Sequence, residues 1–236
     1  PLIAGIGTNS TKSSAELARE VRSWGIDGGL LVTPYYNRPS QEGIYRHVLA
    51  VAEAVPDWPL ILYIVPGRAA VTLEIETIDR LLSRCPQIVS IKDASADLSY
   101  CAELVNCCDD RATVLSGDDP TALAAWAIGA EGSISVGSNL FPAEMAHLWE
   151  LHKEQRLTEA RRAFLSLHPM ICSLFIESNP VPLKYALAEM SRRGLFSFDH
   201  SLEETVRGPL AELSQPHRQR LTEIINRFNP ELFWGQ

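Results

Sequence analysis

The chain has 236 residues, 46% of them hydrophobic, and its 29 acidic and 21 basic side chains give a net charge of −8. It is long enough to bury one large core, and no apolar stretch of about 18 residues predicts a membrane span. The acidic balance argues against nucleic acid or an anionic membrane as a partner. An anionic ligand must therefore be attracted by local positive charge.

Six short apolar runs recur in the first part of the chain, and a stretch with helical period follows each of them. We expect strands at residues 2–6, 29–33, 60–65, 88–92, 113–115 and 133–136. Because the runs are continuous rather than alternating, they indicate a parallel sheet covered on both faces. No nucleotide-binding glycine loop supports a doubly wound sheet, so this α/β pattern favours a (β/α)8 TIM barrel with six visible units.

The stretches between the runs carry helix start and stop signals. Residues 13–16 resemble a capping box, Gly25 is expected to end the first helix, and Ser40 is the expected cap of the second. Asp118 or Asp119, with Pro120, is expected to start the fifth. The expected buried faces of the first three helices are Leu17, Val21 and Trp24, then Ile44, Val48 and Val51, then Ile75, Ile78 and Leu82.

After Leu140 the pattern becomes helical throughout. Helical spacing covers residues 142–151, 157–175, 180–190 and 216–228, with breaks expected at Pro169, at Pro180 and Pro182, and at Gly208 and Pro209. We therefore expect residues 1–140 to hold the barrel strands with their helices. Residues 141–236 should hold the last barrel helix and a C-terminal helical appendage, in the same domain and around the same core.

The cysteines indicate a reducing compartment. Their number is odd, and they form no CxxC pair, so reduced thiols of a cytoplasmic protein are favoured over a disulfide framework. Three of them lie close together in the sequence, but no fourth ligand follows at a suitable spacing, so we expect no metal and no other cofactor. The five are Cys85, Cys101, Cys107, Cys108 and Cys172.

Lys92 is the most unusual residue at the strand ends, where the working groups of a parallel barrel gather. Burying an ammonium group is costly, so this lysine either pairs at the rim, with Asp93 or Glu131, or becomes a neutral amine nucleophile. The other lysines, Lys12, Lys153 and Lys184, fall on helical stretches.

Two neighbouring strand-end residues suit amine chemistry. A desolvated lysine can attack a ketone to give a Schiff base, Tyr63 can relay protons, and Arg68 can hold a carboxylate in bidentate fashion. Each also has a plain structural alternative. Tyr63 could only pack at the rim, Arg68 could form a surface pair, and Gly117, after the fifth strand, could only permit a tight turn.

Five blocks of sequence, in order and in spacing, closely resemble the dihydrodipicolinate synthase family. They are TPYYNRPSQEG at 33–43, LYIVPGR at 62–68, IKDAS at 91–95, LSGDD at 115–119 and ESNPVPLK at 177–184. The resemblance implies a cytoplasmic lyase without a cofactor, a homotetramer made of two tight dimers. It would condense pyruvate with L-aspartate 4-semialdehyde through a lysine Schiff base. The product would be 4-hydroxy-tetrahydrodipicolinate, in diaminopimelate and lysine biosynthesis.

The resemblance also implies residue roles. Lys92 would form the Schiff base, Tyr63 would relay protons, and Arg68 would hold the carboxylate of the semialdehyde. Tyr36 would reach across the tight-dimer interface into the neighbouring site. Two further pairs are implied: Gly117 and Ile134 would line the pyruvate pocket through backbone groups, and Asn9 and Tyr35 match the family's allosteric lysine site.

The chain departs from the family pattern in several places. Ile64 stands where asparagine is usual, Ala69 where threonine is usual, and Ser13 where the allosteric site has an acidic ligand. The family's first two βα units, with a Gly-Thr-Thr-Gly-Glu loop that binds pyruvate, have no counterpart here, so the visible strands would be the third to the eighth. Two alternatives stay open: another pyruvate-dependent aldolase, such as a sialic acid or keto-deoxy sugar acid lyase, or a catalytically silent truncated paralogue.

Overall fold

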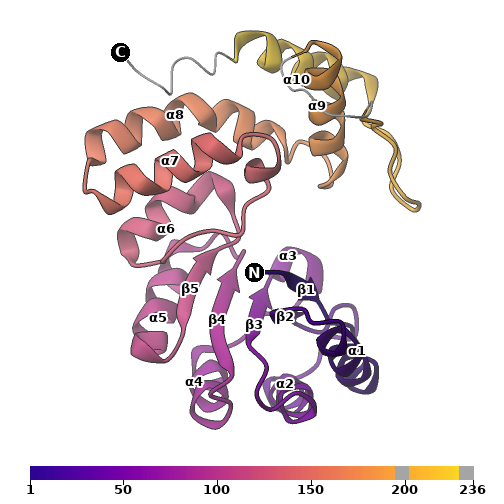
Figure 1. Cartoon of the computed structure of the whole chain (residues 1–236), viewed down its shortest axis with the longest axis vertical. Helices are drawn as coiled ribbons and strands as arrows, with labels where there is room; N and C mark the ends of the chain where they lie inside the picture. Colours follow the sequence, from indigo (N-terminus) through magenta and orange to yellow (C-terminus); the bar gives the residue numbers. More distant parts are fainter. Residues whose placement is uncertain (195–201, 229–236) are drawn as a thin grey trace. The chain divides into compact units, whose positions relative to one another are not determined.

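The computed structural model describes residues 1–194 and 202–228, and the chain forms two compact units, Pro1–Ile134 and Ser135–Gln236. The first unit is built on a sheet of five parallel strands that follow one another in chain order (Figure 1). The strands are β1 (Ile3–Gly5), β2 (Gly28–Val32), β3 (Leu60–Ile64), β4 (Ile88–Asp93) and β5 (Thr113–Ser116).

Helices connect these strands along the outer side of the curved sheet, as the lower part of Figure 1 shows. They are α1 (Thr11–Ser23), α2 (Gln41–Ala54), α4 (Ile75–Arg84), α5 (Leu98–Cys108) and α6 (Ala122–Ile128), whereas the short α3 (Pro66–Ala69) directly follows the end of β3. Parallel strands that pair in sequence order, with helices on one side, form an arc of a (β/α)8 barrel. The prediction of an α/β barrel architecture is thus confirmed, as part of a barrel.

The sixth predicted strand, at residues 133–136, was wrong. The segment makes a single parallel bridge between Ser116 and Ser133, and the Ile134 N–H donates to the Ser116 carbonyl at 2.9 Å. Gly132, just before it, has a φ of +151°, which lies far from the backbone of a strand. The chain therefore leaves the ladder after one residue pair.

The first helix differs from its prediction in its N-terminal cap and in the exposure of Trp24. Ser10, and not the segment 13–16, caps α1, because its side chain accepts a hydrogen bond from the Ser13 N–H. Val21 is buried as expected, but Trp24 is 63% exposed at the end of the helix. Gly25 follows with a φ of +78°, the left-handed conformation expected of a helix stop.

The second helix matches its prediction closely. Ser40 caps α2 by accepting a hydrogen bond from the Gly43 N–H, and Ile44, Val48 and Val51 are buried. On α4 the apolar side chains also face inward, and Ile78 is fully buried. The hydrophobic period of 3.6 residues was sufficient to predict the buried faces, because each of these helices covers the sheet with a single apolar stripe.

The second unit is helical and has a hydrophobic core of its own. Its helices are α7 (Pro142–Lys153), α8 (Leu157–Ser173), α9 (Val181–Arg192) and α10 (Gln215–Arg227). The expected break at Pro169 was wrong, since α8 continues through it. Proline removes only one hydrogen bond, to the carbonyl of Leu165, and Leu165 is exposed, so water can replace that donor. Within the described ranges, no helix is both long and apolar enough to cross a membrane.

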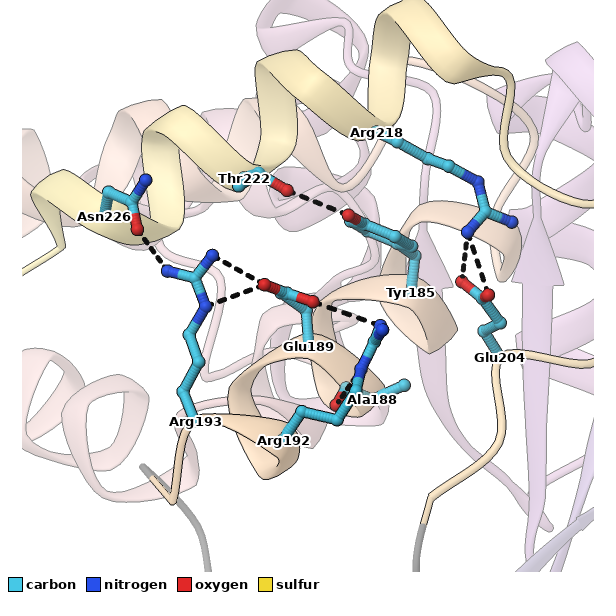
Figure 2. Close-up of polar contacts among 9 residues, drawn as sticks. All are labelled: Tyr185, Ala188, Glu189, Arg192, Arg193, Glu204, Arg218, Thr222 and Asn226. Atoms are coloured by element: carbon cyan, nitrogen blue, oxygen red, sulfur yellow. Dashed lines mark hydrogen bonds and ion pairs between the residues drawn. The ribbon is translucent and has the colours of Figure 1, made fainter.

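Polar contacts fasten α10 to α9 (Figure 2). The Tyr185 hydroxyl lies 2.8 Å from that of Thr222, and Arg193 reaches Asn226. Arg218 holds both carboxylate oxygens of Glu204 at 2.8 Å and lies over the ring of Tyr185. The predicted appendage also includes residues 195–201 and 229–236, which lie outside the described residues, and the boundary after residue 140 with one shared core stays a prediction.

Candidate active site

Lys92 and Tyr63 are register partners on neighbouring strands. Tyr63 on β3 pairs with Lys92 on β4, so their side chains leave the same face of the parallel sheet. The Nζ atom of Lys92 lies 4.2 Å from the centroid of the Tyr63 ring. Both side chains are half-buried. The strand pairing itself therefore brings together the amine and the phenol that the sequence predicted.

The surroundings of Lys92 favour the neutral amine. Burial lowers the pKa of Lys92 below its usual value, the nearby Asp119 carboxylate opposes this change, and Arg68 adds to it. Burial also raises the pKa of Tyr63, against a smaller opposite effect of Arg68. A more readily neutral amine is a better nucleophile, and a protonated phenol beside it can donate a proton.

Gly117 packs directly against the lysine stem. A Cβ atom at this position would lie 2.7 Å from Cε of Lys92 and 2.9 Å from Cβ of Ala94. The Gly117 N–H donates to the Asp93 carbonyl at 2.6 Å. Its φ lies outside the positive range, so no left-handed backbone requires glycine at this position. Glycine is needed here because the aliphatic part of Lys92 occupies the space of a side chain.

The rim pairing of Lys92 is not formed. The Asp93 side chain is buried and accepts a hydrogen bond from the Ser95 N–H at 2.9 Å. Burial raises the pKa of Asp93, which further disfavours a charged partner for lysine. In the part of the chain that the structure describes, no ion pair joins Lys92 to Asp93 or Glu131.

A cavity of about 310 Å³ lies beside Tyr63. Arg68 reaches it from α3, a short helix that begins with Pro66 and that sequence reasoning missed. The cavity combines apolar walls with one cationic side chain, which suits a small anionic carbonyl compound. Its lining consists of Gly5, Gly7, Leu30, Val32, Tyr35, Tyr63, Val65, Arg68 and Ala69.

The remaining predicted site residues lie at the periphery. Tyr36 is 88% exposed and has a φ of +75°, whereas Tyr35 lines the cavity. The Asn9 carbonyl accepts a hydrogen bond from the Asn37 side chain at 3.0 Å. Ile134 is half-buried and bonded through its backbone N–H to the end of β5. The fold thus brings Lys92, Tyr63, Arg68 and Gly117 together, and it leaves Tyr36 facing solvent.

Sequence reasoning missed the position of Asp119. The structure assigns capping to Asp118, whose carboxylate accepts from the Thr121 N–H at 3.2 Å and from its hydroxyl at 2.7 Å. Asp119 is only 1% exposed, and its negative charge opposes the lowering of the pKa of Lys92 by burial. The two adjacent aspartates in the sequence could have indicated a second role, because a helix start needs only one capping side chain.

Ile64 and Ala69, the two residues that differ from the family pattern near Tyr63, are apolar and fully buried. Neither side chain can extend a polar network around Tyr63. Among the described residues, no group of three or more His, Cys, Asp or Glu side chains could hold a metal ion. The polar groups that the fold brings together at this site are the amine, the phenol and the guanidinium group.

A strand-end lysine beside a tyrosine and an arginine, in an arc of a TIM barrel, is an arrangement that suits amine chemistry on a carbonyl compound. Comparison with known families matches residues 1–228 to the dihydrodipicolinate synthetase family. The chain is also 42% identical over 225 residues to the 4-hydroxy-tetrahydrodipicolinate synthase of Thermodesulfovibrio yellowstonii, covering 95% of this chain and 74% of that protein. The chain belongs to the dihydrodipicolinate synthetase family.

Solved structures agree with this assignment. The dihydrodipicolinate synthase of Thermotoga maritima superimposes with a TM-score of 0.89 at 33% identity, over 96% of this chain and 75% of that one. The enzyme from Acinetobacter baumannii complexed with pyruvate has a TM-score of 0.88 at 39% identity, over 96% of this chain and 74% of that one.

Proposed function

We propose that this chain condenses pyruvate with L-aspartate 4-semialdehyde through a Schiff base on Lys92, giving 4-hydroxy-tetrahydrodipicolinate in diaminopimelate and lysine biosynthesis. The observation that carries the proposal is the Lys92 amine held 4.2 Å from the Tyr63 ring, where burial favours its neutral form. A relative that is 42% identical over nearly the whole chain is named 4-hydroxy-tetrahydrodipicolinate synthase, after the same reaction.

The chemistry follows from the neutral amine. Its nitrogen attacks the ketone carbon of pyruvate, and the former carbonyl oxygen leaves as water after taking up protons, which leaves a positively charged iminium. The iminium acidifies the methyl group, whose deprotonated carbon attacks the aldehyde. The amino group of the second substrate then attacks the iminium carbon and releases Lys92. Tyr63 is the proposed proton carrier in these steps because its phenol neighbours the amine.

Arg68 is proposed to bind the carboxylate of the semialdehyde. Its guanidinium group lines the cavity beside Tyr63, on α3 and beyond the end of β3. A carboxylate bound there would keep the aldehyde of the same molecule near Tyr63, the register partner of Lys92. Gly117 and Ile134 are proposed to line the pyruvate end through backbone groups.

Tyr36 is proposed to take part in an interface between two copies of the chain. Its ring is almost fully exposed on a strained, left-handed backbone, an uncommon conformation for a bulky residue. Strained backbone clusters at functional sites, and aromatic side chains are enriched at interfaces between proteins. The proposed assembly is a homotetramer of two tight dimers, and the proposed location is the cytoplasm, where the five free thiols would stay reduced.

Asn9 and Tyr35 are proposed as remnants of an allosteric lysine site. Asn9 lies just before α1, and Tyr35 lines the cavity at the end of β2. Ser13, on the first turn of α1, provides a hydroxyl where a carboxylate is needed to hold an ammonium group. We expect lysine to bind weakly.

Two other functions compete with this proposal. Another pyruvate-dependent aldolase would use the same lysine and tyrosine with a different aldehyde. A catalytically silent paralogue is favoured by the apolar Ile64 and Ala69, which leave Tyr63 with fewer polar neighbours. The other aldolase would differ from the proposed synthase in the aldehyde that it accepts. The silent paralogue would differ in forming no adduct with pyruvate.

Borohydride trapping tests the proposal directly. The chain is incubated with pyruvate and sodium borohydride, and intact mass spectrometry should show one reduced adduct, which peptide mapping should place on Lys92. Lys92→Ala should abolish it, whereas Lys153→Ala, an exposed lysine on α7, should not. An adduct that persists in Lys92→Ala would contradict the assignment, and no adduct on the unsubstituted chain would support the silent paralogue.

A turnover measurement distinguishes the proposed synthase from another pyruvate-dependent aldolase. The rate with aspartate semialdehyde is compared with the rates with sugar-derived aldehydes.

A further inference from the structure

Arg68, the cation of the site, lies on a helix of a single turn, α3. A helix this short has too few hydrogen bonds of its own to be stable by itself. Its start is fixed at the end of β3, since the Arg68 and Ala69 N–H groups both donate to the Val65 carbonyl at 2.9 Å. Its end leads through Ala70, which has a left-handed φ of +60°, into residues 71–74 before α4 begins. The contacts of residues 71–74 therefore help to decide where the guanidinium group lies.

Gln41, the first residue of α2, binds this loop with both ends of its side-chain amide. The amide nitrogen donates to the Thr72 carbonyl at 3.0 Å, and the amide oxygen accepts from the Glu74 N–H at 3.0 Å. Ser40 caps α2 by accepting from the Gly43 N–H, which fixes the backbone from which Gln41 extends. One half-buried side chain thus satisfies a carbonyl and an N–H group two residues apart.

Tyr100 on α5 holds the residue between these two. Its hydroxyl donates to the Leu73 carbonyl at 2.7 Å, and the Leu73 side chain is fully buried. The helix that follows the loop, α4, packs against both α2 and α5. Residues 72–74 are therefore each bonded to a side chain from one of the two helices that flank α4.

We propose that Gln41 and Tyr100 are positioning residues that fix the end of α3 and thereby keep Arg68 at the cavity beside Tyr63. The cavity is lined by other side chains, Arg68 among them, so both residues would act through Arg68. Their effect on the second substrate rests on the proposed function, which assigns the semialdehyde carboxylate to Arg68. Without these contacts α3 would occupy more positions, and a bound carboxylate would have to order it.

The first test measures α3 itself and needs no substrate. Amide hydrogen exchange is followed by NMR at Ala69 and Ala70, whose N–H groups close the turn of α3. Gln41→Ala should raise both exchange rates by about three- to tenfold, the factor that corresponds to one hydrogen bond. Tyr100→Phe keeps the ring and loses only the bond to Leu73, so it should raise the same two rates.

Gln87→Ala is the matched control. Gln87 is also half-buried, and its side-chain amide donates to a carbonyl of α2 at 3.0 Å, but it lies before β4, at the opposite end of the strands. This variant should leave exchange at Ala69 and Ala70 unchanged. If Gln41→Ala does not fold, as judged by circular dichroism, Tyr100→Phe carries the test. Unchanged exchange in the folded variants overturns the proposal, as does an equal rise in Gln87→Ala.

Kinetics then test whether the two residues act through Arg68. Gln41→Ala should raise KM for the semialdehyde by about three- to tenfold and leave kcat and the rate of pyruvate adduct formation unchanged. In an Arg68→Ala background the same substitution should have no further effect on this KM, because the group through which it acts is gone. An unchanged KM in the single variant, or a further rise in the double variant, overturns the positioning role.

The two tests also separate this proposal from the proposed function. If the unsubstituted chain forms no pyruvate adduct and does not turn over the semialdehyde, the proposed function fails. The exchange rates at Ala69 and Ala70 still decide in that case whether Gln41 and Tyr100 hold α3.

Discussion

Tyr63 and Lys92 are paired across β3 and β4, and this register places the lysine nitrogen 4.2 Å from the centre of the tyrosine ring. The two residues are far apart in sequence, and the contact depends on the alignment of the two strands. The ring shields the amine from water on one side and can attract its ammonium form. The phenol oxygen of the same ring is the proposed proton carrier.

Tyr63→Phe should separate these two effects. The ring and its contact with Lys92 remain, but the hydroxyl is lost, so pyruvate adduct formation should slow by about 100-fold or more, as expected when a general acid–base group is removed. Stopped-flow or quenched borohydride trapping measures this rate. An adduct that forms at the unsubstituted rate would show that another group carries the proton.

Gly117→Ala should displace the lysine stem. The new methyl group would lie 2.7 Å from Lys92 Cε, so the side chain must move or the loop must shift. Overpacking of this kind costs about 1–3 kcal/mol of stability. Adduct formation should fall by about tenfold or more. Gly67→Ala is the control, because no atom lies within 4 Å of its added methyl group. Equal behaviour of the two variants in trapping would contradict the packing role of Gly117.

Arg68→Ala should weaken binding of the second substrate more than of the first. Loss of a charge-assisted carboxylate contact should raise KM for the semialdehyde by about 10- to 100-fold. The KM for pyruvate should change less, since Arg68 lies at the end of the cavity formed by α3. Steady-state kinetics with each substrate varied in turn measures both. A larger effect on pyruvate would reverse the assignment.

His47 should make the fold less stable in acid. Its ring is 3% exposed, its Nδ1 lies 3.0 Å from the Thr11 hydroxyl, and burial lowers its pKa. The unfolded chain therefore binds more protons than the fold, from about pH 6.5 downward to the lowered pKa, and the free energy of unfolding should fall across that window. Urea unfolding at several pH values should show a shallower loss for His47→Leu. An identical pH dependence in both proteins would exclude His47 as a source.

Ser13→Glu should strengthen binding of L-lysine. Ser13 is exposed on the first turn of α1, and a carboxylate there could pair with the ammonium group of the ligand. A charge-assisted bond of about 1.5–3 kcal/mol corresponds to about ten- to hundredfold in affinity. Isothermal titration measures the affinity, with Ser23→Glu at the other end of α1 as the control. Tight binding by the unsubstituted chain would show that the hydroxyl suffices.

The sequence by itself determined five of the strands, because continuous apolar runs and turn residues are local patterns. It also identified Lys92, Tyr63 and Arg68, since each lies at or just beyond a strand end. The resemblance in five motifs to a known family added the expected reaction. The comparisons support the family and the partial barrel, while the roles of the individual residues stay predictions.

Only the tertiary structure decided features that depend on distant neighbours. The sequence offered both Asp118 and Asp119 as the cap. In the structure Asp118 caps the turn, whereas the charge of Asp119 influences the pKa of Lys92, which lies on another strand. From the sequence, Gly117 could be explained as a turn residue. In the folded chain the aliphatic part of Lys92, on the neighbouring strand β4, occupies the space that a side chain at position 117 would need. The run at 133–136 has strand composition, but a strand forms only where its backbone groups find partners, and beyond Ser133 the ladder ends.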